Sequence, residues 1–123
     1  MKIKTKRQKQ AENLLKKDID EIIRREISDP KIGFFTITYA RISRDFKNAT
    51  VGVSVIGNKE VQEETFEAIK HASGYIHHKL AKRSVMKYTP ELQFEYDDMP
   101  EIRVEEILKN IDMEENEKNK DTN

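Results

Sequence analysis

The residues best suited to chemistry lie between positions 70 and 88, which carry five Lys/Arg and three His but no Asp or Glu. The cations are Lys70, Lys79, Lys82, Arg83 and Lys87. Cations gathered in this way neutralise phosphates, and the counterions that they displace make affinity fall as salt rises. The stretch therefore predicts a surface that binds a polyanion, with RNA as the first candidate. The alternative is that the charges only solvate an exposed face.

The same stretch contains Ser73 and Gly74, a pair that weakens a helix and permits a bend. Apolar residues recur at helical spacing on both sides of the pair. We therefore expect one helix from an N-cap at Asn58 to about residue 73, and a second over residues 75–87. Because Gly74 has no Cβ, an RNA backbone could approach it closely, and the next helix offers free N–H groups. A plain turn between two helices is the alternative.

The second of these helices is expected to have one packed face and one cationic face. Ile76 and Leu80 share the packed face. The opposite face carries His78, Lys79 and Lys82, with Arg83 at its margin. Carboxylates paired with these cations would remove the predicted phosphate-binding surface. Tyr75 could stack on a base, or it could be a partly buried core tyrosine.

Other chemistry is poorly supported. His77 and His78 are adjacent, so their side chains diverge on a helix, and no carboxylate near them or His71 completes a metal site. A turn after a strand explains Asp97 and Asp98 more simply than a general acid/base or Mg²⁺ pair. The chain has no cysteine, no phosphate-binding Gly-rich loop and no nucleophile elbow. We expect a binding protein, not an enzyme, without metal or cofactor.

The rest of the chain supplies the elements that would hold this stretch. Apolar spacing predicts a helix over residues 8–27, which Asp29-Pro30 ends. Residues 34–42 and 49–56 form an antiparallel hairpin, and residues 92–96 form a third strand. The long helical crossover favours a parallel third strand. The result is an α+β layer, a three-stranded sheet with helices on one face, plus a short final helix over 104–111.

Length and composition limit the class of protein. A chain of 123 residues with 36% apolar content forms one modest core. We expect a single domain over residues 1–111, flexible over 1–6, and a disordered acidic and polar tail over 112–123. No apolar run approaches the roughly 20 residues that span a bilayer, and the absence of cysteine suits a reducing cytosol. A cytoplasmic protein without membrane contact is the expectation.

The formal net charge is zero, but opposite charges lie in different regions of the chain. Residues 1–25 carry nine Lys/Arg against four Asp/Glu, whereas residues 89–123 carry four against twelve. Separated charges create opposite potentials on different surfaces, and a basic surface steers an anionic partner toward it.

Four blocks together resemble the ribosome-binding factor A family. They are REISDPKIG at 25–33, SRD at 43–45, ASGYI at 72–76 and TPEL at 89–92. Each block alone is a weak signal, but all four occur in the order and spacing of the family. The resemblance covers roughly residues 5–97.

The resemblance implies a KH-like fold of the second type, α-β-β-α-kink-α-β, in which an Ala-x-Gly kink at Ala72–Gly74 replaces a Gly-x-x-Gly loop. Members of the family assist late maturation of the bacterial small ribosomal subunit, notably in the cold, and bind its RNA near the 5′ end and the decoding region. They leave when assembly is complete. The RNA-binding residues expected here are Lys70, Ala72, Ser73, Gly74, His78, Lys79, Lys82, Arg83, Lys87 and Arg7. We expect a monomer that meets the small subunit, its RNA and other assembly factors such as a ribosome-dependent GTPase.

Two positions depart from the family pattern. Arg7 matches the first of two arginines near the N-terminus, but Gln10 stands at the second, and the segment 99–103 lacks a glycine before the final helix. Two other functions stay open. One is a general KH-type binder of single-stranded RNA or regulator, and the other is a protein–protein adaptor that uses the acidic tail and the basic face.

Overall fold

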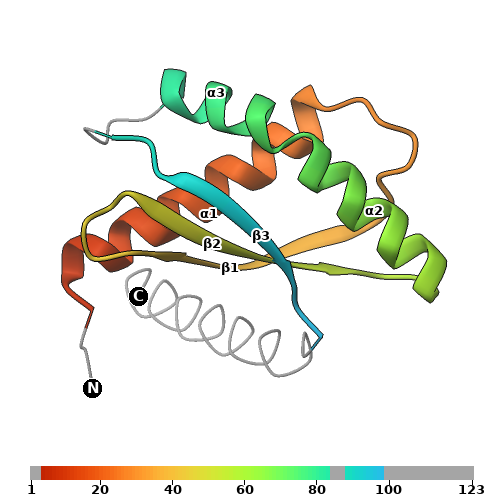
Figure 1. Ribbon diagram of the computed structural model, residues 1–123, viewed down its shortest axis with the longest axis horizontal. Helices are drawn as coiled ribbons and strands as arrows, with labels where there is room; N and C mark the ends of the chain where they lie inside the picture. Colours follow the sequence, from red (N-terminus) through yellow and green to blue (C-terminus); the bar gives the residue numbers. More distant parts are fainter. Residues whose placement is uncertain (1–3, 84–87, 99–123) are drawn as a thin grey trace, which may run out of the picture.

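The computed structural model describes residues 4–83 and 88–98. The elements are α1 (Lys6–Glu26), β1 (Phe35–Ile42), β2 (Asn48–Val55), α2 (Lys59–His71), α3 (Ser73–Arg83) and β3 (Glu91–Tyr96). The strands form one sheet in the order β1-β2-β3, and the three helices pack on one face of it (Figure 1). This is the predicted α+β architecture, consistent with a KH-like fold of the second type. The predicted helix over 104–111, the tail over 112–123 and Lys87 lie outside the described residues.

The sheet is mixed, and β2 is its central strand. Val51 of β2 lies opposite Ala40 of the antiparallel β1 and opposite Phe94 of the parallel β3. Both the hairpin and the parallel crossover expected from the sequence are confirmed. Val51 and Val53 are fully buried, because helices cover the face of β2 toward which they point.

Helix α1 begins at a capping box. The Thr5 side chain accepts a hydrogen bond from the Gln8 N–H, and the Gln8 side chain accepts one from the Thr5 N–H, each at 3.1 Å. These bonds satisfy N–H groups that lack partners at a helix start, so α1 begins at Lys6, earlier than predicted. The box also fixes residues within the segment expected to be flexible. Helix α1 is anchored by its fully buried residues Leu15, Ile19, Ile22 and Ile23.

Side chains of α1 also close the free edge of β1. Glu12 accepts a hydrogen bond from the Ile42 N–H at 2.7 Å, and Arg24 donates one to the Phe35 carbonyl at 2.9 Å. Lys4 lies 2.9 Å from the other oxygen of the Glu12 carboxylate and neutralises it. Backbone groups on an edge strand otherwise offer a template for another chain, so these contacts protect the sheet against edge-to-edge association.

The bend between α2 and α3 lies at Ala72 alone. Its φ of −85° and ψ of 2° depart from regular helix. The prediction that Ser73 and Gly74 lie between two helices is wrong, because both are the first residues of α3. The Ala72 N–H donates to the Ala68 carbonyl, and the Ile76 N–H donates to the Ala72 carbonyl at 2.9 Å. Helical hydrogen bonding therefore resumes at once, and α2 and α3 form one bent run over the sheet (Figure 1).

Candidate nucleic-acid interface

A groove lies where the junction of α2 and α3 meets β3, which is an edge strand of the sheet. Its volume is about 310 Å³, and it is lined by Lys70, Ser73, Leu92, Gln93 and Phe94. We call it the junction groove. Two of the predicted RNA-binding residues thus lie together. The three β3 residues were missed, because a strand pattern gives no sign of which helix lies beside it.

Lys70 stands on the rim of the junction groove with an exposed ammonium group. Its one ion-pair partner among the described residues is Glu67, three positions earlier on α2, at 3.6 Å. Both side chains are about half exposed or more, and such a pair contributes little energy. The ammonium nitrogen of Lys70 lies 5.5 Å from the centroid of the Phe66 ring, a cation–π contact that orients the side chain without neutralising its charge.

Gly74 is exposed, and a Cβ built on it would meet no atom within 4 Å. It is the second residue of α3, and its φ is not positive, so the fold itself does not require glycine there. What the missing side chain provides is open space on the outer surface of the junction. Ala72 differs, because it is half-buried and packs against the hydrophobic core.

Two of the four cations predicted to contact RNA from α3 and its end are paired with carboxylates of α1. Lys79 lies 3.5 Å from Glu26, and Arg83 lies 3.0 Å from Glu21. Arg83 also lies 4.0 Å from both Asp18 and Glu26. We call these five residues the α1–α3 ion cluster. The prediction that Lys79 and Arg83 are free surface cations is wrong, because the fold places α1 beside them.

Burial of Asp18 within the ion cluster raises the pKa of its carboxyl group above the ordinary value. The positive charge of Arg83 opposes that rise, whereas the neighbouring carboxylate of Glu21 adds to it. Arg83 therefore compensates for negative charges that α1 would otherwise hold close together. Its main role in the described structure is to fix α3 against α1.

The other two polar side chains predicted on the outer face of α3 are exposed. His78 and Lys82 are exposed, and within residues 4–83 and 88–98 neither is in an ion pair with a carboxylate. Tyr75 is 43% exposed and lies outside the core, so its ring is available for stacking. Lys79 lies 5.5 Å from the centroid of that ring. Ile76 and Leu80 are buried, which confirms the packed face.

Arg7 does not join the junction. Its guanidinium lies 5.7 Å from the ring centroid of Phe46, in the turn between β1 and β2. Figure 1 shows the start of α1 beside this turn. Arg7 therefore belongs to a second basic region, separate from the junction groove.

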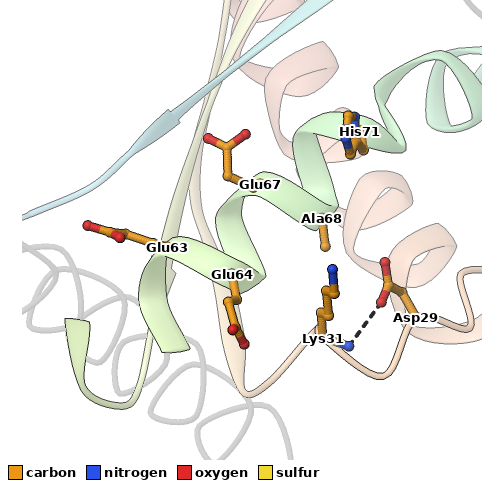
Figure 2. Close-up of a pocket in the computed structure, with 7 residues that line it drawn as sticks. All are labelled: Asp29, Lys31, Glu63, Glu64, Glu67, Ala68 and His71. Carbon is orange, nitrogen blue, oxygen red and sulfur yellow. Dashed lines mark hydrogen bonds between the residues drawn. The ribbon is translucent and has the colours of Figure 1, made fainter. Parts of the chain in front are cut away.

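An acidic hollow of about 320 Å³ lies on another side of α2 (Figure 2). Its lining residues are Asp29, Lys31, Glu63, Glu64, Glu67, Ala68 and His71. The backbone N–H of Lys31 donates to the Asp29 carboxylate at 2.9 Å, which shapes the loop (Figure 2). Four carboxylates in one hollow repel phosphate, so this side of α2 marks the limit of any RNA-binding surface.

Neither a metal site nor a membrane span is found in the described part of the chain. No three His, Asp or Glu side chains there come together as a possible metal site. His71 and His78 are exposed and His77 is half-buried. No described helix combines the length and the apolar character needed to cross a bilayer.

Comparisons with known proteins agree on one family. The model of the family "Ribosome-binding factor A" matches residues 7–111. The ribosome-binding factor A of Halothermothrix orenii is 42% identical over 115 residues, which cover 92% of this chain and 94% of that protein.

Solved structures are similar as well. The crystal structure of ribosome-binding factor A from Thermus thermophilus has a TM-score of 0.64 at 26% identity and covers 72% of this chain and 94% of its own. A homology model of the Thermus thermophilus factor, fitted into a cryo-EM map of a 30S–RbfA complex, has a TM-score of 0.57 at 26% identity. It covers 68% of this chain and 88% of its own.

Proposed function

The chain belongs to the ribosome-binding factor A family, and we propose that it binds the immature small ribosomal subunit through the junction groove. The RNA of the subunit is the contact, and the protein acts on it by position, without catalysing a reaction. It acts in the cytoplasm as a monomer, with no cofactor, and leaves when the subunit is mature. Other assembly factors, such as a ribosome-dependent GTPase, are the partners expected at release.

The observation that carries this proposal is the open space at Gly74, the residue after Ser73 of the junction groove, which Lys70 also lines. A phosphate backbone can approach the α3 backbone there without meeting a side chain. Lys70 lies on the groove, and His78 and Lys82 continue the polar surface along α3. Tyr75 offers an exposed ring on which a base can stack.

Lys79 and Arg83 have a different part in this proposal. Their ion pairs with α1 hold α3 in position, so they support the RNA-binding surface without supplying its main charge. The side chain of Arg83 is about one-third exposed. At that exposure the ion pair is screened by salt.

The test is to fill the open space. Gly74→Gln adds a side chain where nothing lies within 4 Å, so the fold tolerates it, and a helix gains up to about 1 kcal/mol when glycine is replaced. We expect Gly74→Gln to lower co-sedimentation with immature small subunits at least about tenfold in apparent affinity. The melting temperature should stay equal or rise. Ser28→Gln, at an exposed position on the loop after α1, is the control and should bind like wild type.

The outcomes separate the proposed function from its alternatives. Wild-type binding to immature subunits that disappears at high salt supports it, whereas equal binding to short single-stranded RNA favours a general KH-type RNA binder. Binding that added RNA does not compete away favours a protein–protein adaptor. Unchanged binding by Gly74→Gln would show that the junction groove is not the contact.

A further inference from the structure

The turn between β1 and β2 meets the first turns of α1 to form a second cationic surface. Its exposed cations are Lys6, Arg7, Lys9, Arg44 and Lys47, which we call the turn patch. The Arg7 guanidinium over the Phe46 ring joins the two segments. We propose that the turn patch binds the phosphate backbone of the same RNA that occupies the junction groove. This inference rests on the proposed function for the identity of the RNA.

The turn leaves its cations, Arg44 and Lys47, exposed. The Ser43 hydroxyl donates to the Asp45 carboxylate at 2.6 Å, and that carboxylate accepts the Lys47 N–H at 3.1 Å. The Phe46 N–H donates to the Ser43 carbonyl at 2.9 Å. Ser43 and Asp45 are thus occupied in shaping the turn. Arg44 stands between them, exposed and outside every ion pair within the described residues.

The turn also contains backbone strain. Phe46 has a φ of 61°, in the left-handed region that a bulky residue rarely adopts. The strain persists because Phe46 packs against the core from inside while Arg7 covers its ring from outside. A turn held this firmly fixes the backbone positions of its cations before a ligand arrives. Less ordering is then needed on binding.

Two carboxylates of this region, Glu12 and Asp45, already have partners within the protein. Glu12 is buried and bonded to Lys4 and to the Ile42 N–H. Hydrogen bonds from Ser43 and the Lys47 backbone lower the pKa of the Asp45 carboxyl, so it stays an acceptor inside the turn. The turn patch therefore keeps a net positive charge.

The composition and the position of the turn patch favour RNA phosphate over an acidic protein as its ligand. Protein interfaces are centred on buried apolar and aromatic anchors, whereas Phe46 is half-buried beneath Arg7 and offers none. The Lys47 carbonyl accepts the N–H of Glu91, the first residue of β3. The next residue, Leu92, lines the junction groove, and successive residues of a strand are about 3.3 Å apart along it. One RNA segment can therefore reach both surfaces.

The test compares two double variants that remove the same charge. Arg44→Gln with Lys47→Gln removes two of the five cations of the turn patch, and Lys31→Gln with Lys59→Gln removes two exposed lysines on the acidic side of α2. Binding to immature small subunits is measured over a series of salt concentrations. Two lost phosphate contacts reduce the slope of log affinity against log salt by about 1.4–1.8. We expect that reduction for the turn variant and none for the control, with similar melting temperatures.

Each other result has a distinct meaning. If the turn variant and the control show the same salt slope of binding, the inference is overturned. The proposed function still stands in that case, provided that the wild-type protein binds immature subunits. Competition by polyglutamate that exceeds competition by RNA would assign the patch to an acidic protein, and would also overturn it. If the wild-type protein does not bind immature subunits, the proposed function fails. Binding of the same variants to poly(U) then tests by itself whether the turn patch binds phosphate.

Discussion

The side of α3 that faces α1 and the junction that faces β3 contain the same kinds of residue in one short run of sequence, yet they differ in role. Lys79 and Arg83 meet carboxylates of α1 within 3.5 Å. Lys70 and Lys82 meet no such cluster among the described residues, and Lys70 lines the junction groove. The number of cations in a stretch therefore overstates the charge available to a ligand, because ion pairs within the folded protein neutralise part of that charge.

Both regions depend on the packing of α3 against the hydrophobic core, so disrupting that packing should have the largest effect. Leu80 is 2% exposed, so Leu80→Ala deletes buried methyl groups and leaves a cavity. We expect a loss of about 2–5 kcal/mol in the free energy of unfolding, measured by urea denaturation. Binding and stability should fall together. Normal stability in this variant would mean that α3 is not anchored as described.

Two matched double variants test this difference, one at Lys70 of α2 and Lys82 of α3 and the other within the ion cluster. Lys70→Gln with Lys82→Gln should reduce the salt slope of subunit binding by about 1.4–1.8 while the melting temperature hardly changes. Lys79→Gln with Arg83→Gln should do the reverse, lowering the free energy of unfolding by about 1 kcal/mol, because partly exposed ion pairs are worth little each. Equal loss of binding in both variants would contradict the division of roles.

The salt dependence of stability in the free protein should also distinguish the two regions. The side chains of the ion cluster are partly exposed, from 18% at Asp18 to 31% at Arg83 and Glu21, so salt screens them. We expect the stability difference between wild type and Lys79→Gln with Arg83→Gln to shrink as NaCl rises from low concentration to about 1 M. Thermal melts of the two proteins at several salt concentrations measure it. A difference that stays constant would show that Arg83 stabilises through packing of its stem instead.

The smallest expected effect concerns pH. Burial raises the pKa of Asp18 above its ordinary 3.8, so the folded state holds that proton more tightly than the unfolded chain. The contribution of Asp18 to stability therefore decreases as pH rises from about the ordinary value to the raised one. Asp18→Asn should remove this decrease, and NMR titration of Arg83→Gln should show the pKa of Asp18 rising further. A pKa that falls in that variant would contradict the pairing.

Much of the fold follows from local pattern. Aromatic and β-branched content predicted β1, and period-two spacing predicted β2 and β3. Helical spacing predicted the three described helices, and the long crossover predicted a parallel β3. The bend was misplaced because sequence propensity marks Ser73 and Gly74 as weak points, whereas packing of Ile69 and Ile76 puts the break at Ala72 between them.

The candidate site was less predictable, because its decisive contacts join distant parts of the chain. Arg83 and Glu21 are 62 residues apart, so nothing near Arg83 reveals its partner. Leu92–Phe94 lie beside Ser73 only once β3 pairs with β2. Arg7 was predicted as an RNA-binding residue from the family pattern, but only its contact with Phe46 places it at the turn patch.

The most direct measurement is photo-crosslinking from two exposed aromatic positions. Tyr75 is the third residue of α3, next to Gly74, and Phe34 is exposed at the start of the hairpin, where its carbonyl accepts the Ile56 N–H. Each is replaced in turn by p-benzoylphenylalanine and irradiated with immature small subunits. The account predicts an adduct with ribosomal RNA from position 75 and none from position 34. RNA adducts from position 34 alone, or equally from both, would contradict it.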